Sequence, residues 1–363
     1  MQSNLFKNLY NENYIELLAT SIKTSYLEFN SNVFTKTVFD DSWKEKELKQ
    51  RMRHIAETMR TFLPNEYANS IEILTSAFSV IGTGYTLENM IFQDFVELFG
   101  MDDFETSIVA LEHFTIGSSS EFAIRRFIIK YPQRTMQQMK KWAYSENEHV
   151  RRLASEGCRP RLPWAIALQE FKIDPTTVIE ILEILKDDSS EYVRKSVANN
   201  LNDISKDNPE IVKKLAKKWL GENDTRDKVV KYGCRTLLKE SDRFTLNLFE
   251  YTEPKNINIE NISIPKAVNF GEELEFSFSI FSKEDLGKVR LEFAIEFLRK
   301  NDNYSKKVFK ISEGDFKLKR KKIIKKYSFK KITTRNYYSG KHKLYLIING
   351  DIFHKQEFIL ESF

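Results

Sequence analysis

The chain has 363 residues, of which 41% are hydrophobic, 13% aromatic and 30% charged, and it holds two cysteines and twelve glycines. This composition excludes an intrinsically disordered chain, a collagen-like fibre and a disulfide-stapled miniprotein. The length predicts about two domains. No apolar run approaches the roughly 20 residues that cross a bilayer, and the N-terminus lacks a signal-peptide pattern, so we predict a cytoplasmic protein without a membrane partner.

Basic residues are unevenly distributed along the chain. Residues 1–120 carry 9 basic and 17 acidic side chains, residues 121–172 carry 11 and 5, and residues 254–363 carry 23 and 14. Within the last zone, residues 299–343 hold 17 basic and 3 acidic side chains. Two interpretations stay open for these lysines: a surface that binds a polyanion, or the solvated faces of a lysine-rich protein.

The first two thirds of the chain show apolar residues at spacings of three and four, which indicates amphipathic helices. Helices are predicted within residues 12–29, 47–64, 68–78, 90–100 and 121–132. From residue 121 a repeat emerges, because 145–157 and 188–200 share a polar turn, a glutamate, an aromatic ring and a Val-Arg pair. A weaker third copy covers 224–238. A period near 40 residues is typical of HEAT-like α-solenoids.

After residue 249 the periodicity changes to two, which indicates β-strands. Strands are predicted at 273–282, 288–298, 325–332 and 341–350, separated by turns such as SEGD at 312–315. About 110 residues with six or seven short strands suit an immunoglobulin-like β-sandwich. We therefore predict a multidomain chain, α then β: a HEAT-like helical solenoid over 1–253 and a β-sandwich over 254–363, with the linker around Pro254.

The sequence contains no recognisable metal or nucleophile motif. The five histidines are scattered, no Cys-x-x-Cys spacing occurs, and no glycine-rich phosphate loop is present. Cys158 has no histidine partner in the pattern, which favours a structural thiol. We predict neither a metal nor a cofactor.

The segment HVRRLASEGCRPRLPW (149–164) is the most informative part of the sequence. Gly157 is predicted to end one helix and Pro163 to open the next, with a tight connection between them. Glu156 then lies in a last turn, where the helix dipole disfavours a carboxylate, with basic residues one turn before it and directly after it. One interpretation is an ion-pair ladder between repeats. The other is a grip on phosphates in which the carboxylate stabilises a positively charged sugar.

The residues ELKQRMRHIA (47–56), RRLASEGCRPRLPW (151–164) and VRKSVANNLND (193–203), together with the appended sandwich, resemble the AlkC-type DNA alkylation repair glycosylases, relatives of the AlkD HEAT-like repeat glycosylases. The resemblance implies a monofunctional glycosylase of base excision repair. Such an enzyme hydrolyses the N-glycosidic bond of cationic alkylated bases, chiefly 3-methyladenine and 3-methylcytosine, in double-stranded DNA without base flipping. It also implies that the sandwich is an accessory DNA-binding domain.

The resemblance assigns roles to residues of this sequence. Glu121, Glu156 and Trp164 are the candidate catalytic residues, with the carboxylates stabilising an oxocarbenium-like sugar on the concave solenoid surface. The candidate DNA-binding residues are Arg152, Arg159, Arg161, Arg125, Arg126, Arg194, Lys195 and Phe122. For both glutamates a structural role is the alternative, and for Trp164 and Phe122 it is packing between repeats.

Three functions remain open at this point. The preferred one is a monomeric glycosylase that acts at the nucleoid. A non-catalytic HEAT-repeat module that binds unusual DNA structures is the alternative, and a solenoid that binds proteins is the third. Release of an alkylated base from duplex DNA separates the first from the other two.

Overall fold

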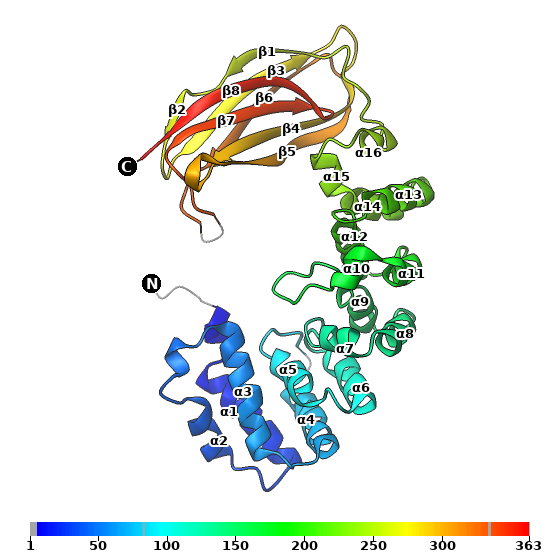
Figure 1. The fold of residues 1–363 in the computed structure, drawn as a ribbon, viewed down its shortest axis with the longest axis vertical. Helices are drawn as coiled ribbons and strands as arrows, with labels where there is room; N and C mark the ends of the chain where they lie inside the picture. Colours follow the sequence, from blue (N-terminus) through cyan, green and yellow to red (C-terminus); the bar gives the residue numbers. More distant parts are fainter. Residues whose placement is uncertain (1–5, 83, 333–334, 363) are drawn as a thin grey trace. The chain divides into compact units, whose positions relative to one another are not determined.

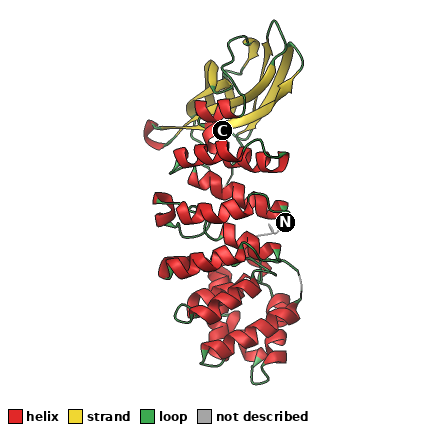
Figure 2. Ribbon diagram, turned by 90° about the vertical axis from the view of Figure 1, so that its right-hand side faces the viewer, coloured by secondary structure: helices red, strands yellow, loops and turns green. Residues whose placement is uncertain are grey.

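The computed structural model describes residues 6–82, 84–332 and 335–362. The chain forms two compact units, which we call the helical unit (1–208 with 221–233) and the β-containing unit (209–220 with 234–363). Helices dominate the first unit and strands the second (Figure 2). The described residues include no helix long and apolar enough to cross a membrane.

The N-terminal helices follow the predicted apolar periodicity. Their bounds are α1 Glu12–Ser25, α2 Ser31–Val38, α3 Leu48–Phe62, α4 Tyr67–Ile81, α5 Met90–Phe99 and α6 Phe104–Phe114. The side chain of Asn11 accepts a hydrogen bond from the backbone of Tyr14 and so caps the start of α1, while α3 ends just before Pro64 as predicted. α1 packs against α4, and α3 packs against α5.

The repeat predicted from residue 121 onward is confirmed as a stack of helices. The bounds are α7 Ile124–Lys130, α8 Pro132–Trp142, α9 Glu148–Glu156, α10 Gln169–Ile173, α11 Thr176–Leu185, α12 Glu191–Ile204 and α14 Asp224–Gly233. The equivalent valines Val150, Val193 and Val229 are all buried. They lie on α9, α12 and α14, which pack in that order, whereas α8 and α11 form a second row (Figure 1). The helical part is thus a HEAT-like solenoid.

The helix predicted within residues 121–132 is confirmed as α7, which ends at Lys130 because Pro132 opens the next helix. One local expectation in this part is wrong. Pro163 does not start a helix, and residues 157–168 form a loop before α10. Figure 1 shows this loop leaving α9 on the side away from α8 and α11.

The β-containing unit is a sandwich of two sheets. Its strands are β1 Asn258–Ser263, β2 Ala267–Asn269, β3 Glu273–Phe281, β4 Gly287–Leu298, β5 Tyr304–Phe316, β6 Arg320–Ser328, β7 Gly340–Ile348 and β8 Asp351–Glu361. One sheet has the order β1-β3-β6 and the other β2-β8-β7-β4-β5. Neighbouring strands are antiparallel except for the β2–β8 pair.

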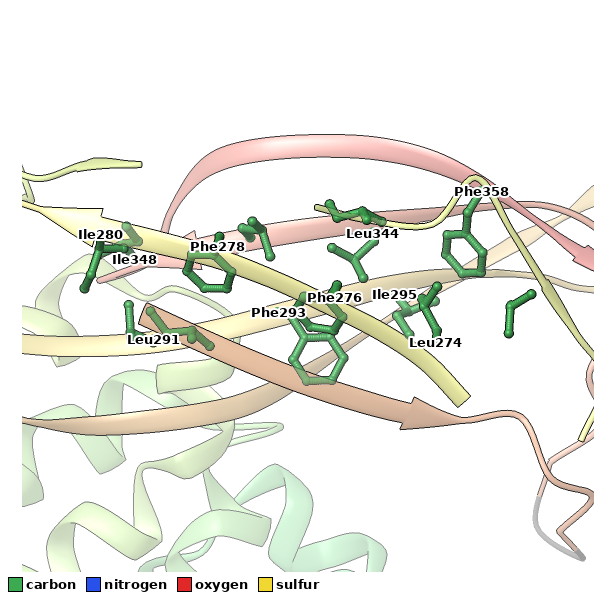
Figure 3. Close-up of a cluster of buried hydrophobic side chains, with 14 of the residues drawn as sticks. Leu274, Phe276, Phe278, Ile280, Leu291, Phe293, Ile295, Leu344, Ile348 and Phe358 are labelled. Carbon is green, nitrogen blue, oxygen red and sulfur yellow. The ribbon is translucent and has the colours of Figure 1, made fainter. Parts of the chain in front are cut away.

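Buried side chains of both sheets form one hydrophobic core. Phe276 and Phe278 on β3 meet Leu291 and Phe293 on β4 between the layers (Figure 3). The alternation of buried and exposed residues along β3 explains why its sequence has a period of two. The predicted immunoglobulin-like architecture is confirmed, but the described residues form eight strands where six or seven were predicted, and the expected turn SEGD lies inside β5.

Three helices of the chain belong to the β-containing unit: α13 Pro209–Trp219, α15 Arg235–Lys239 and α16 Arg243–Leu248. α15 packs against β5, and Arg243 of α16 donates a hydrogen bond to the carbonyl of Asn349 at 3.3 Å and contacts Asp351. The predicted boundary at residue 253 therefore separates helices from strands, whereas the compact units divide earlier in the chain.

Candidate functional site

Arg152 lies at the centre of the candidate site and holds both predicted carboxylates. Its Nη1 is 2.7 Å from Oε2 of Glu121, and its Nη2 is 3.7 Å from Oε1 of Glu156, one helical turn further along α9. Glu121 comes from the turn before α7, so two separate elements converge on one guanidinium. Burial lowers the pKa of Arg152, but the two carboxylates outweigh this effect and raise it above its ordinary value.

The two glutamates differ in how many of their oxygens are occupied. Oε2 of Glu121 also accepts a hydrogen bond from Ser119 at 2.7 Å, while no described residue donates to its Oε1. Glu156 is 5% exposed and uses both oxygens, with Arg159 at 2.5 Å from Oε1 and the Ser196 hydroxyl at 2.6 Å from Oε2. Glu121 therefore keeps an oxygen available to a ligand.

Arg159 bridges Glu156 to Asp203 at the end of α12. Its Nε and Nη2 each lie 2.8 Å from Oδ2 of Asp203, and its residue exposure is 7%. Three carboxylates thus surround the two guanidiniums of Arg152 and Arg159, and Lys206 adds an ammonium 2.9 Å from Asp203. Because its N–H groups bind carboxylates of two different helices, Arg159 links neighbouring repeats. A guanidinium that is bound and buried in this way does not suit the predicted phosphate contact.

Trp164 stands on the loop 157–168 and is 70% exposed. Its φ of 64° lies in the left-handed region, which costs a non-glycine residue of order 1 kcal/mol or more. Lys49 of α3 donates a hydrogen bond to its carbonyl. An exposed indole on a strained backbone indicates a contact surface, because the fold does not use the ring for packing.

Arg125 occupies a different position from the one predicted. It is fully buried on α7, and it donates to the carbonyls of Ile166 at 2.7 Å, Gly157 at 2.9 Å and Arg159 at 2.7 Å. Burial lowers its pKa to about 10. A phosphate cannot reach a guanidinium that is enclosed in this way, so the predicted DNA contact is wrong for this conformation.

A hollow opens beside Trp164. It is lined by Lys49, Met52, Arg53, Asp94, Glu97, Phe122, Arg126, Trp164, Ala165 and Ile166. The ammonium of Lys49 lies 4.4 Å from the centre of the Phe122 ring. Arg126 is half-exposed and only 3.6 Å from Glu97, whereas Arg53 binds Asp94 through two hydrogen bonds of 2.9 Å. The structure thus brings the predicted site residues Phe122, Arg126 and Trp164 together around one hollow.

The remaining predicted DNA-binding residues have protein partners. Arg161 pairs with Asp207 at 2.6 and 2.8 Å on the exposed surface. Arg194 donates to the carbonyls of Asp188 and Ser189 at the start of its own repeat. Lys195 pairs with Glu191 one turn away, with both side chains exposed. Because Arg161 and Lys195 are exposed, a phosphate can reach both side chains. The hydrogen bonds of Arg194 to two backbone carbonyls disfavour a phosphate contact for that residue.

Sequence reasoning missed an aromatic cluster behind Arg152. The Tyr192 ring lies 4.8 Å from the Arg152 guanidinium, its hydroxyl is 3.3 Å from that of Tyr85, and Tyr85 stacks on His149 at 5.0 Å. The aromatic position of the repeat motif, occupied by His149 and Tyr192, was visible in the sequence. Its contact with Arg152 was not, because Tyr192 comes from the next repeat.

The described residues contain no group of three or more His, Cys, Asp or Glu side chains that could hold a metal ion. Cys158 and Cys234 are buried and free, and burial raises the pKa of each thiol to about 12. Neither thiol suits nucleophilic chemistry.

Comparisons with known proteins agree with this geometry. The family described as DNA alkylation repair enzyme matches residues 86–252, and the C-terminal Ig-like domain of YhaZ matches residues 258–362. The alkylpurine DNA glycosylase AlkC of Pseudomonas fluorescens, bound to DNA containing an abasic site analogue, superposes with a TM-score of 0.92 at 33% identity, over 98% of this chain and 99% of that one. The chain belongs to the AlkC-type DNA alkylation repair family. The uncharacterized protein YhaZ of Bacillus subtilis (strain 168) is 43% identical over 95% of this chain and 96% of its own length.

Membership of the AlkC-type family confirms the recognition made from residues 151–164 and explains the succession of a helical region and an Ig-like domain. The family model covers α5 to α16, which includes Arg152 and both predicted carboxylates. Arg152 and its two carboxylates therefore lie within the region that matches this family, whereas Lys49, Arg53 and Tyr85 precede it.

Proposed function

We propose that this protein is a monofunctional DNA glycosylase that releases cationic alkylated bases, such as 3-methyladenine and 3-methylcytosine, from double-stranded DNA. The observation that carries the proposal is the convergence of Glu121 and Glu156 on Arg152, with one oxygen of Glu121 left without a protein donor. The relationship to AlkC supports DNA as the partner.

A base methylated on a ring nitrogen carries positive charge and leaves readily, so the enzyme need not protonate it. As the bond breaks, positive charge develops on the deoxyribose, and a fixed carboxylate stabilises that charge more strongly in the transition state than in the ground state. Arg152 holds the two carboxylates in position before the substrate arrives. Water that attacks the anomeric carbon replaces the departing base and leaves an abasic site.

Exposed groups around the carboxylates suit contacts to the nucleotide and its neighbours. Trp164 presents an exposed aromatic face to a sugar or a base, Phe122 lies half-buried against Lys49 in the same hollow, and Arg126 presents a half-exposed cation to a phosphate. Because the described residues beside Trp164 form an open hollow next to a protruding loop, the arrangement favours a reaction without base flipping. We propose that the protein acts as a monomer on the chromosome in the cytoplasm.

The test is release of methylated base from alkylated duplex DNA by the wild type, Glu121→Gln and Glu156→Gln. We expect each variant to lose about 10²-fold or more in rate. The matched control is Glu180→Gln, because Glu180 is an exposed glutamate that pairs only with Lys140 on the surface. Full activity in both site variants with normal DNA binding would contradict the carboxylate mechanism. DNA binding by the wild type without base release would instead favour the non-catalytic module.

A further inference from the structure

The buried guanidinium of Arg125 has no carboxylate within hydrogen-bonding distance among the described residues, which is unusual for a charged group at 0% exposure. All three of its hydrogen bonds end on backbone carbonyls of a single loop. These charge-assisted hydrogen bonds offset part of the cost of burying the guanidinium, and they hold the loop in one conformation.

The three carbonyls come from both ends of the loop that carries Trp164. Gly157 and Arg159 precede Trp164, and Ile166 follows it. A further hydrogen bond of 3.1 Å joins the backbone nitrogen of Leu168 to the carbonyl of Pro160 and closes the loop below its tip. The two ends of the loop are thus fixed to each other, and the tip with Trp164 projects beyond them.

Close packing reinforces this attachment. A Cβ at Gly157 would lie 2.7 Å from Cγ2 of Ile124, the residue directly before Arg125, so the loop starts in contact with α7. The loop residues Cys158, Leu162 and Leu168 are buried, in contrast with Trp164 at the tip. The tip is held by the hydrogen bond from Lys49 to the Trp164 carbonyl and by the pair of Arg161 with Asp207, and its left-handed backbone persists because both flanks are held as well.

We propose that Arg125 is a positioning residue: by bracing the two flanks of the loop 157–166, it holds Trp164 at the rim of the hollow that also presents Phe122. The effect on catalysis rests on the proposed glycosylase function, whereas the bracing of the loop does not. Displacement of the indole by about 1 Å is enough to slow a reaction that depends on orientation.

Proteolysis reports on the loop without reference to activity. Trypsin can cut the bond between Arg161 and Leu162 at the tip side of the loop, whereas Pro160 protects the bond after Arg159. In Arg125→Met we expect about tenfold faster cleavage at Arg161, measured well below the melting temperature, because local opening exposes the bond. Arg125→Lys keeps the buried charge, but its three donors share one nitrogen, so it should show a smaller acceleration and serves where the methionine variant does not fold.

Arg151→Met is the matched control. Arg151 is also largely buried and donates to two backbone carbonyls, those of Ser145 and Glu146, but it braces the turn before α9. The Arg151→Met variant should be cleaved at Arg161 at the wild-type rate. Cleavage of both Arg125 variants at the wild-type rate would overturn the proposal.

A double-mutant cycle tests whether Arg125 acts through Trp164. In the otherwise wild-type protein, Arg125→Lys should lower the single-turnover rate of base release about tenfold. In the Trp164→Ala background the same substitution should have little further effect, and the affinity of each variant for DNA should stay within about twofold of the wild type. Additive losses would overturn the link to Trp164. Absence of base release from the wild type would instead refute the glycosylase function, and the proteolysis result would still decide the role of Arg125 in the loop.

Discussion

Removal of the Tyr192 ring should slow base release, because the ring holds Arg152 between the two carboxylates. The ring centre lies 4.8 Å from the Arg152 guanidinium, which also contacts both carboxylates. Tyr192→Leu removes the aromatic face, whereas Tyr192→Phe keeps it and loses only the hydroxyl. The two variants thus separate the cation–π contact from the hydrogen bond to Tyr85.

The structure sets the size of the effect. The Arg152 side chain is 16% exposed, so the contact is largely desolvated and falls in the upper half of the cation–π range, about 1–2 kcal/mol. If this contact energy is lost from the transition state, Tyr192→Leu releases the base about 5- to 30-fold more slowly than the wild type. The hydroxyl contact at 3.3 Å is long, so Tyr192→Phe should lose about twofold or less.

The assay is single-turnover release of methylated base from alkylated duplex DNA, with a thermal melt of each variant to verify folding. The expected order of rates is wild type, Tyr192→Phe, then Tyr192→Leu. Wild-type activity in the leucine variant, or equal losses in both variants, would refute the reasoning that the ring positions Arg152.

Three further outcomes are expected. Gly157→Ala should lower the free energy of unfolding by about 1–3 kcal/mol, because the new Cβ would meet Ile124 at 2.7 Å; an unchanged thermal melt would contradict this. Burial raises the pKa of Asp94 to about 6, so between about pH 4 and pH 6 the folded chain keeps a proton that the unfolded chain has lost. This difference stabilises the folded chain by at most about 3 kcal/mol below about pH 4, and the stabilisation disappears as the pH rises to about 6. Asp94→Asn should flatten that dependence in denaturant titrations, and an unaltered slope would count against the assignment. Cys158 and Cys234 should resist iodoacetamide until the protein unfolds, as followed by mass spectrometry, and modification of the native protein would show that the thiols are accessible.

The fold could be predicted where one face of an element is buried. The valines of the repeat and the alternating residues of β3 follow the periods of a packed helix and a half-buried strand. β5 was not predicted, because three lysines interrupt its apolar pattern and its glycine resembles a turn. The register shift between Leu291 and Glu292 on β4 accommodates the pairing with this part of β5.

The site could be predicted only where its contacts are local. The pairing of Arg152 with Glu156 follows from their spacing of one helical turn, and it is confirmed. The bonds from Arg125 to the loop, and from Arg159 to Asp203, join elements that only the stacking of helices brings together. Both arginines were therefore interpreted as exposed, although the structure buries them.

The central claim is that the carboxylates around Arg152 stabilise a sugar cation. The most direct measurement is single-turnover base release from duplex DNA that contains 3-methyladenine, by the wild type and by the double variant Glu121→Gln, Glu156→Gln. We predict that the wild type yields free methylated base and an abasic site, and that the double variant binds the same DNA without detectable release. Release by the double variant at the wild-type rate would contradict the claim.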